Sequence, residues 1–307
     1  MYIFENRISL ASRSLINEYL EGSGNRTSGL SFSSLYMWRN ENNFSYQVIE
    51  GYLCISGLSY LEEDEKFHFM FPPVAKDGSY ESESLRKCIL EAKAIFEEKC
   101  GTFELRLVPD ENKQAVEEAL PEIKWIDDRA NYDYIYLRRE IEELKGKKFH
   151  AKKNYVNSFK KNFEYEYLDI SSDMTDELME FIDFFVKSKN IDEHDMQLLQ
   201  MEYDALRDVF EHFEEAGFYG GVIKIDGKVQ AMAAGGIICG NMVIEHIEKA
   251  NKEYRGLYPA MLQEFSKHLP EDIEYINREE DMDIENLRKA KMSFKPCELV
   301  AKYIGRF

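Results

Sequence analysis

The sequence predicts an α+β protein with mixed sheets (α/β mixed sheets). The protein is expected to consist of two similar units. The expected elements run in the order helix, helix, three strands, helix, strand, helix, strand, and this order occurs in both halves of the chain. A length of 307 residues suits two domains. A hydrophobic share of 44% with 32% charged residues is typical of globular proteins. We therefore expect tandem domains at residues 1–144 and 145–307, which repeat in topology and not in sequence.

Local signals predict each element of the first half. Leu85, Ile89, Ala92 and Phe96 recur at helical spacing and predict a long helix. Gly51 separates two alternating runs, which is typical of a hairpin. The expected elements are helices at 9–20 and 31–38, strands at 44–50, 52–56 and 66–71, a helix at 84–99, a strand at 103–108, a helix at 111–120 and a strand at 131–137.

The second half gives the same kinds of signal. Asp226 and Gly227 lie between two alternating runs and predict a tight hairpin. The run AAGG at 233–236 would allow a ligand or a backbone to approach in mid-sheet, and close packing under a helix explains it equally well. The expected elements are a strand at 164–169, helices at 175–190 and 197–215, strands at 218–225, 228–238 and 242–250, a helix from about 259, a strand at 273–277, a helix at 284–292 and a strand at 297–304.

Composition excludes several classes of function. The net charge of −19 disfavours binding of DNA over the bulk of the protein. Five scattered cysteines without a CxxC motif indicate reduced thiols and no metal site. The N-terminus has no signal-peptide pattern, and the most apolar run, 229–244, is too short and too polar to cross a membrane. We expect a soluble, cytoplasmic protein without a transmembrane segment.

Three stretches carry a resemblance to a known family. They are FHAKKNYVNSFKKNFEYEYLD (149–169), YRGLYPAM (254–261) and INREEDMDIENLRKAKMSFKP (276–296). They resemble a bacterial family of tandem GNAT proteins of unknown function. That family is related to the C-terminal domain of phosphatidylglycerol lysyltransferases and, more distantly, to Fem-type peptidoglycan aminoacyltransferases. The resemblance implies two GNAT-like domains, of which the second carries the site.

The resemblance also implies acyl or aminoacyl transfer from an activated ester to an amine or hydroxyl acceptor. In the GNAT fold, a loop with the pattern Arg/Gln-x-x-Gly-x-Gly/Ala holds the coenzyme A pyrophosphate at a helix N-terminus. Here the aligned stretch is 253–258, with Glu253 for the cation and Tyr258 for the second glycine, and the first half has no such motif. Lys249, Lys252, Arg255 and Gly256 remain as donor-binding candidates. Aminoacyl-tRNA therefore fits as co-substrate better than acyl-CoA, and the alternative is a non-catalytic ligand-binding or regulatory protein on a degenerate scaffold.

Several side chains are candidates for catalysis or substrate binding. Strand alternation over 242–250 would put Glu245, Ile247 and Lys249 on one face and Ile244, His246 and Glu248 on the other, so either Glu245 or His246 is a candidate base. A cross-strand charge pair is the alternative for both. The remaining candidates are Asn277 for positioning a substrate, the acids Glu279, Glu280 and Asp281 for a cationic aminoacyl group, Asn286 in the last helix, and the phenols of Tyr258 and Tyr303.

The segment 145–161 carries seven lysines and no acid in this acidic chain. Phe149, Val156, Phe159 and Phe163 recur at helical spacing and predict an amphipathic helix docked on the protein. Its polar residues either pair with neighbouring acids or form a dock for an anion such as a tRNA acceptor stem. Lys153, Asn157 and Lys160 are the candidates for contact with an anionic donor.

Overall fold

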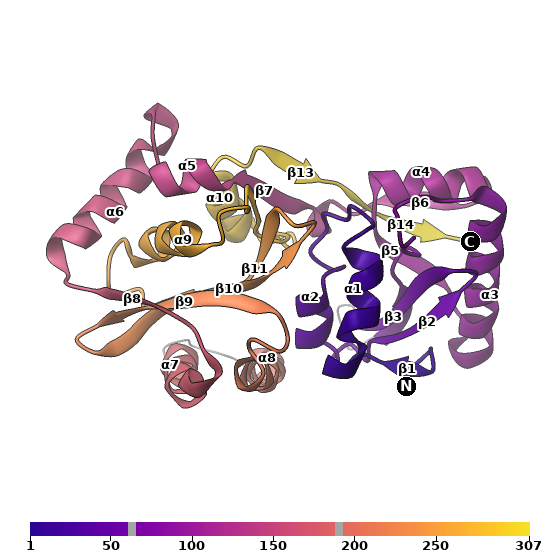
Figure 1. The fold of residues 1–307 in the computed structure, drawn as a ribbon, viewed down its shortest axis with the longest axis horizontal. Helices are drawn as coiled ribbons and strands as arrows, with labels where there is room; N and C mark the ends of the chain where they lie inside the picture. Colours follow the sequence, from indigo (N-terminus) through magenta and orange to yellow (C-terminus); the bar gives the residue numbers. More distant parts are fainter. Residues whose placement is uncertain (61–65, 188–192) are drawn as a thin grey trace. The chain divides into compact units, whose positions relative to one another are not determined.

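The computed structural model describes residues 1–60, 66–187 and 193–307. The chain forms two compact units (Figure 1). The first comprises residues 1–134, 279–288 and 299–307, and the second comprises residues 135–278 and 289–298. Each is a mixed α/β structure built on a sheet that has seven strands in the described part of the chain. The predicted mixed sheet, used twice, is confirmed.

The first unit has a core between its sheet and two helices. Helices α3 and α4 cover one face, α1 and α2 the other (Figure 1). The predicted apolar stripe of α3, from Leu85 to Phe96, is fully buried against strand residues such as Cys54 and Leu105. Its elements are β1 (Asn6–Arg7), α1 (Arg13–Leu20), α2 (Phe32–Met37), β2 (Ser45–Ile49), β3 (Tyr52–Tyr60), β4 (Lys66–Met70), α3 (Ser82–Cys100), β5 (Glu104–Pro109), α4 (Asp110–Ala119), β6 (Lys124–Asp127) and β14 (Lys302–Arg306).

The second unit has the same layered arrangement. Its elements are β7 (Asp133–Leu137), α5 (Arg138–Glu143), α6 (His150–Asn162), β8 (Glu166–Asp169), α7 (Thr175–Lys187), α8 (Glu193–Glu211), β9 (Phe218–Ile225), β10 (Lys228–Ile238), β11 (Met242–Ala250), α9 (Leu257–His268), β12 (Tyr275–Asn277), α10 (Glu285–Met292) and β13 (Glu298–Val300). The first residues of β7 and of α10 and the last residues of β13 belong to the first unit. Short 3₁₀ turns lie at Leu10–Ser12, Arg129–Asn131, Lys147–Phe149 and Ser172–Met174.

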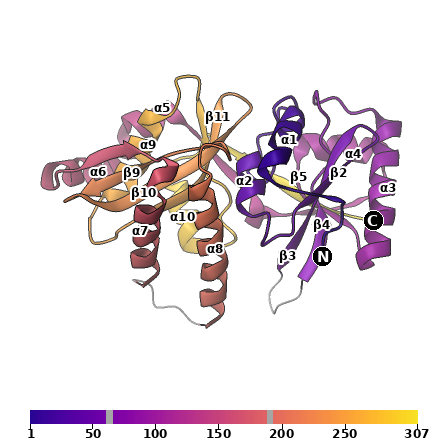
Figure 2. The same cartoon turned by 60° about the horizontal axis from the view of Figure 1, so that its bottom comes forward.

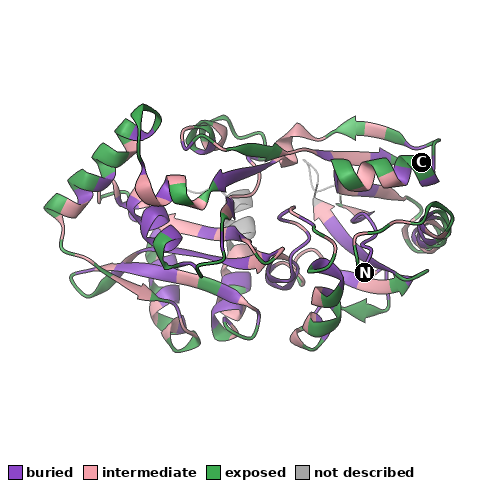
Figure 3. Cartoon of the chain, turned by 45° about the horizontal axis from the view of Figure 1, so that its top comes forward, coloured by how far each residue is buried: buried purple, intermediate pink, exposed green. Residues whose placement is uncertain are grey.

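Helices cover both faces of the second sheet. α9 lies on one face and is packed in turn against α5 and α6, whereas α7 and α8 run side by side on the other face (Figures 1 and 2). The central strands are buried along most of their length (Figure 3). Asp226 and Gly227 have φ angles of 52° and 75° and make the predicted tight turn between β9 and β10.

The two sheets have the same strand order, with one exchange. The first runs β1-β2-β3-β4-β5-β14-β6 and the second runs β8-β9-β10-β11-β12-β7-β13. In each sheet the fourth and fifth strands are parallel and the other recorded pairs are antiparallel. The sixth position of the first sheet is taken by the C-terminal strand β14, and that of the second sheet by β7.

This exchange differs from the predicted division at residue 144. The sequence predicts the strand at 131–137 for the first domain, whereas β7 lies in the second sheet. The single strand predicted at 297–304 is two short strands, β13 in the second sheet and β14 in the first. Local pattern cannot assign a sheet, because any short alternating strand offers the same edge hydrogen bonds to either one.

A buried ion pair joins β14 to the rest of the first unit. Lys302 Nζ lies 2.7 Å from Asp133 Oδ1 and 3.1 Å from Ser28 Oγ, and Ser28 donates its own N–H to Asp133 Oδ2 at 2.8 Å. The side chains of Lys302 and Asp133 are 1% and 0% exposed. Burial lowers the pKa of Lys302, but Asp133 and Glu280 outweigh burial and raise it overall.

None of the helices in the described ranges has both the length and the apolar character needed to cross a bilayer.

We expect Lys302→Met to destabilise the protein by about 3 to 5 kcal/mol, because it leaves the Asp133 carboxylate buried without its cation. Urea unfolding measures the loss. Arg306→Met is the matched control on the same strand, since Arg306 is 56% exposed beside Glu104 and should cost less than about 1 kcal/mol. Equal losses in the two variants would contradict the role given to Lys302.

Candidate functional site

Strands β11 and β12 of the second unit separate part-way along their length. Their parallel pairing runs over Met242–Ile244 and Tyr275–Asn277. From Glu245 onward, the recorded pairing of β11 within the described residues is with β10 alone. The sheet therefore opens beside the second half of β11.

A β-bulge in β11 changes which side chains share a face. Ala234 pairs with Ile247 and Gly235 pairs with Glu245, so His246 is an extra residue opposite β10. The predicted alternation, with Glu245 and Glu248 on opposite faces, is wrong for this reason. Both carboxylates contact the guanidinium of Arg278.

Gly235 makes room for the bulge. A Cβ atom at this position would lie 1.6 Å from the carbonyl oxygen of Ile244. No L side chain fits at that separation, so the small-residue run at 233–236 serves a close backbone approach, one of the two readings that the sequence left open.

Arg278, the first residue after β12, is the centre of an ionic cluster with Glu245 and Glu248. Its Nε donates to Glu245 Oε2 at 2.5 Å, and its Nη2 donates to Glu248 Oε2. The side chains of Glu245 and Arg278 are 2% and 10% exposed. The second oxygen of Glu245, Oε1, is buried and has no hydrogen-bond partner among the described residues. Two carboxylates thus share one cation, and one carboxylate oxygen still lacks a donor.

The pKa of Glu248 is raised to about 7. Burial is the largest cause, and the nearby Glu245 carboxylate adds to it, whereas Arg278, Lys291 and Lys152 act in the opposite direction. Burial lowers the pKa of Arg278, but Glu245 and Glu248 raise it by more, so Arg278 stays charged. Glu248 is therefore a carboxyl group that exchanges its proton near neutral pH.

Five further side chains lie around this cluster. Lys291 Nζ donates to the carbonyl of Arg278, and the Lys291 carbonyl accepts from Tyr136 Oη at 2.9 Å. The ring of Phe294 lies under two cations, Lys152 Nζ at 4.1 Å and the Arg278 guanidinium at 5.3 Å from its centroid. Tyr258 has a pKa raised mainly by burial and further by Glu248, which places this predicted residue within electrostatic range of the cluster.

The predicted pyrophosphate loop is covered by α6. A Cβ atom on Gly256 would lie 2.4 Å from the carbonyl oxygen of Tyr155, which belongs to α6. The Arg255 guanidinium stacks over the Tyr155 ring at 5.2 Å, and Phe163 packs edge-on against Tyr254 at 5.1 Å. A carbonyl oxygen and two aromatic rings therefore occupy the surroundings in which the GNAT fold would hold phosphate oxygens.

The lysines of 145–161 have different environments. Lys160 lies 2.5 Å from Glu264, which also binds Lys267 at 3.1 Å, and Lys148 lies 2.5 Å from Glu140. Lys153 and Asn157 are exposed on α6, as is Lys161. Lys148 and Lys160 therefore pair with acids, as one alternative predicts, whereas Lys153 and Lys161 face solvent, and the anion dock stays a prediction.

Four further candidates lie on β11 or near it. Lys249 lies 2.6 Å from Glu202 of α8 and over the ring of Phe185 of α7. The His246 ring packs near Phe218 at 5.7 Å. Asn277 is fully buried at the end of β12, and Lys252 is exposed.

The predicted acids after β12 belong to the first unit. The buried carboxylate of Asp281 accepts from both guanidinium nitrogens Nε and Nη2 of Arg288 at 2.8 Å and from Tyr134 Oη at 2.5 Å. Glu280 lies 3.9 Å from Lys302. Asp281 is therefore a structural acid and not a site for a cationic aminoacyl group, which corrects the prediction for this residue.

Three other predicted residues also lie in the first unit. Glu279 has a left-handed φ of 57° and Asn286 is exposed on α10. Tyr303 of β14 packs near Trp125 and has a pKa raised chiefly by its hydrogen bond with Asp110.

The corresponding place in the first unit is filled by side chains. β4 and β5 pair at Met70 and Leu105 alone, and Arg106 lies 3.9 Å above the ring of Phe67 while bonded to Glu104. At the start of α3, the Glu81 carboxylate accepts from the N–H groups of Glu83 and Ser84, so an anion already caps this helix.

Sequence reasoning missed Arg278, Glu248 and Lys152. Arg278 lies within the stretch INREED, where an arginine followed by acids gives no sign of burial. Glu248 was assigned to the opposite face from Glu245 because the bulge has no sequence signature apart from Gly235. The position of Arg278 directly after the strand predicted at 273–277 is the sequence signal that could have suggested carboxylate partners on the neighbouring strand.

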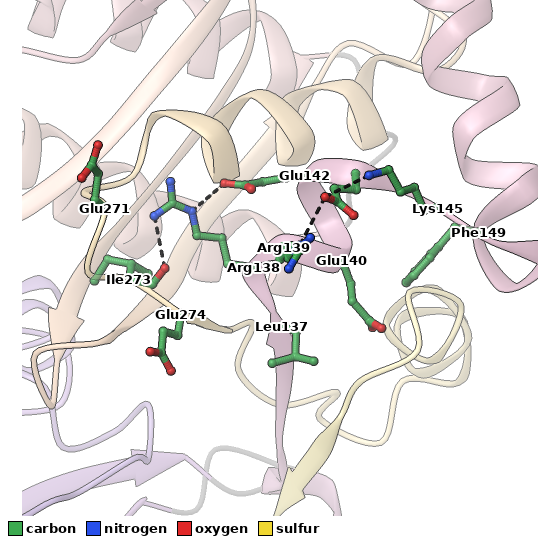
Figure 4. Close-up of a pocket in the computed structure, with 11 residues that line it drawn as sticks. Leu137, Arg138, Arg139, Glu140, Glu142, Lys145, Phe149, Glu271, Ile273 and Glu274 are labelled. Carbon is green, nitrogen blue, oxygen red and sulfur yellow. Dashed lines mark hydrogen bonds and ion pairs between the residues drawn. The ribbon is translucent and has the colours of Figure 1, made fainter.

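A separate hollow of about 780 Å³ lies at the end of β7 (Figure 4). It is lined by Leu137, Arg138, Arg139, Glu140, Glu142, Glu143, Lys145, Phe149, Glu271, Ile273 and Glu274. Its three cations are all held, since Arg138 bonds to Glu142 and to the Ile273 carbonyl, and Arg139 and Lys145 both bond to Glu143. None of the predicted site residues lines this hollow, and its chemistry does not suit an anion.

Comparisons with known proteins identify the family of the chain and the solved structures that it resembles. The sequence model of a family described as "Phosphatidylglycerol lysyltransferase, C-terminal" matches residues 21–306. The chain belongs to this family. Comparison with curated proteins found no match. The predicted relationship to phosphatidylglycerol lysyltransferase C-terminal domains is confirmed by the family match.

Solved structures similar to this member of the family support the fold. A conserved protein of unknown function from Bacteroides thetaiotaomicron VPI-5482 is 32% identical, with a TM-score of 0.89 and full coverage of both chains. L-PGS from Bacillus licheniformis is 13% identical, with a TM-score of 0.66 over 98% of this chain and 92% of that chain. FemX is 10% identical, with a TM-score of 0.65 over 97% and 96%. At such identities the last two show the fold alone, and the predicted class of two mixed-sheet units in tandem is confirmed.

We expect Gly235→Ala to cost about 3 kcal/mol or more in stability, because the new methyl group collides with the Ile244 carbonyl and forces the bulge to move. Chemical denaturation gives the difference in free energy of unfolding. Gly240→Ala is the control, since Gly240 lies in the turn between β10 and β11 and has nothing within 4 Å of the added Cβ, so only its φ of 72° costs about 1 to 2 kcal/mol. The role of Gly235 is contradicted if both variants cost the same.

Glu248→Gln should stabilise the protein more at about pH 8 than at about pH 5. The folded-state pKa of Glu248 is raised to about 7 from 4.5, so its favourable contribution is complete below the unfolded value and is lost as pH rises through about 7. The neutral amide does not titrate and keeps that contribution. Melting temperatures of both proteins across this range test the expectation, and a difference that does not change with pH would refute it.

Proposed function

We propose that the second unit transfers an acyl or aminoacyl group from an activated ester to an amine or hydroxyl acceptor, with Glu248 as the base. The observation that carries the proposal is the carboxyl group of Glu248, whose pKa of about 7 suits proton transfer at neutral pH, beside the point where β11 and β12 separate. Membership of a family named for a lysyltransferase supports aminoacyl transfer as the reaction class.

The chemistry follows from the cluster. The lone pair of a neutral acceptor amine or hydroxyl attacks the ester carbonyl, and the acceptor gives its proton to the Glu248 carboxylate. N–H groups of β11 that point away from β10 stabilise the negative oxygen of the tetrahedral intermediate. The C–O bond to the leaving group then breaks, and the proton held by Glu248 passes to the departing oxygen. Arg278 holds Glu245 and Glu248 in place throughout.

An aminoacyl ester suits this unit better than acyl-CoA as the donor. The carbonyl oxygen of Tyr155 faces Gly256, and an oxygen at that place repels phosphate. In the first unit, Glu81 caps α3 with its own carboxylate. An ester whose leaving group is a ribose hydroxyl needs no such pyrophosphate loop.

Exposed cations of the second unit support a tRNA acceptor stem as the carrier. Lys153 and Lys161 of α6 face solvent, as do Lys252 and Arg255 of the following loop. Asn157 adds a neutral donor on the same helix, whereas Lys160 is held by Glu264. Few phosphate contacts are available, so binding should weaken clearly with added salt.

Two observations favour a second function, that of a non-catalytic ligand-binding protein. The covered loop at Gly256 and the filled strand junction of the first unit both differ from a GNAT site that binds coenzyme A. On this alternative, the cluster around Arg278 is structural, and a small ligand would raise the melting temperature without being converted.

Transfer from radiolabelled aminoacyl-tRNA tests the proposal. With phosphatidylglycerol vesicles or small amines as acceptors, we expect the full-length protein to move label from tRNA to acceptor, and Glu248→Gln to slow this by about 10²-fold or more. Glu253→Gln, an exposed acid of the same unit, is the matched control and should leave the rate unchanged. Lys153→Glu with Lys161→Glu should raise KM and reduce the salt dependence.

Two results would count against this function. A Glu248→Gln protein that transfers label at the normal rate removes Glu248 from the chemistry. Absence of transfer with every aminoacyl donor, together with a melting temperature raised by a small metabolite, favours the ligand-binding alternative.

A further inference from the structure

Lys152 is a half-buried lysine that the proposed transfer does not use. It lies on α6, next in sequence to the exposed Lys153. Its Nζ is 4.1 Å from the centre of the Phe294 ring, and the Arg278 guanidinium lies 5.3 Å from the centre of the same ring. Two cations therefore share one aromatic ring next to the cluster of Glu245, Arg278 and Glu248.

The ammonium group of Lys152 is poorly compensated. No side chain or carbonyl in the described ranges accepts a hydrogen bond from it, whereas Lys148 and Lys160 of the same segment each have a glutamate at 2.5 Å. Burial lowers the pKa of Lys152, and the Arg278 charge lowers it further, while Glu248 opposes both. The face of Phe294 also favours the charged form, so the net effect is smaller than burial and Arg278 alone would give. A larger share of Lys152 is therefore neutral at physiological pH than for an ordinary surface lysine.

We propose that Lys152 is a site of acylation by activated acyl compounds such as acyl phosphates, thioesters and active esters. The neutral amine attacks the acyl carbonyl and forms an amide bond. The bond from the carbonyl carbon to the leaving oxygen or sulfur breaks, and the proton lost from the amine ends on the leaving group. No oxidant or other co-reactant is needed, and the reaction does not require the proposed aminoacyl transfer.

Acylation of Lys152 would change the neighbouring carboxyl group. The charged groups that face Glu248 are Arg278, Glu245, Lys291 and Lys152, and the three cations lower its pKa. An amide at Lys152 removes one of these cations, so the pKa of Glu248 rises further. The modification thus links the supply of activated acyl groups to the protonation of the cluster.

A competition between adjacent lysines tests the proposal in the full-length protein. The protein is treated with a limiting amount of the N-hydroxysuccinimide ester of acetic acid. Chymotrypsin, which cleaves after Phe149 and Tyr155, then releases the segment 150–155 with both Lys152 and Lys153. Fragment-ion mass spectrometry gives the ratio of the two acetylated forms. Because both lysines lie in one peptide, differences in the efficiency of digestion and ionisation do not affect this ratio.

At about pH 7 we expect Lys152 to be acetylated about threefold faster than Lys153 or more, although Lys152 is the less exposed. The ratio should fall below one at about pH 11, where both amines are neutral and exposure decides the rate. Acetyl phosphate in place of the ester should give the same order. A ratio below one at neutral pH with either reagent overturns the proposal.

Two variants sharpen the test. Glu248→Gln removes the carboxylate that raises the pKa of Lys152, so labelling of Lys152 at neutral pH should become faster while Lys153 is unaffected. Lys152→Arg should abolish the fast label and leave the Lys153 rate as it was. Unchanged Lys152 labelling in a folded Glu248→Gln protein would show that the cluster does not set its reactivity. These expectations for lysine acetylation do not depend on aminoacyl transfer. If no transfer is detected, the labelling experiment still tests the proposal for Lys152.

Discussion

One extra residue in β11 decides the chemistry of the second unit. Without the bulge at His246, strand alternation would send Glu245 and Glu248 to opposite faces of the sheet. With it, both carboxylates reach the guanidinium of Arg278, and Gly235 supplies the space that the displaced Ile244 carbonyl requires. Burying two acids with one arginine is costly, because desolvation offsets much of the attraction. That cost appears as the raised pKa of Glu248, the property on which the proposed base depends.

The two units show how one topology can carry different sites. Both sheets have the same strand order, and in both the parallel pair is short. In the first unit, Arg106 over Phe67 fills this junction, and Glu81 caps the following helix. In the second unit, titratable groups gather at the junction instead. The fold alone therefore does not assign an activity, and the proposed transfer depends on the side chains around Arg278.

Helix α6 connects the cluster with the surface of the same unit. Its apolar residues, among them Phe159, dock it on α9, as its helical spacing predicted. Its lysines then divide by direction: Lys152 turns toward Phe294 and the buried cluster, Lys160 pairs with Glu264, and Lys153 faces solvent. A single cationic segment thus supplies a buried amine, an ion pair and a free surface charge. Its net charge alone says little about its role.

The sequence by itself determined most of the longer helices and strands, the mixed sheets and the duplication, because helical spacing, alternation and turn residues such as Asp226 and Gly227 act over a few neighbours. It also indicated the region around Glu245. It did not predict β6 or α5, or that the last strand is divided. Only the tertiary structure decided that β7 and β14 exchange sheets, that Asp281 is held by Arg288, and that Arg278 joins Glu245 to Glu248. These depend on contacts between residues far apart in the chain and on a one-residue change of register, and neither leaves a periodic trace in the sequence.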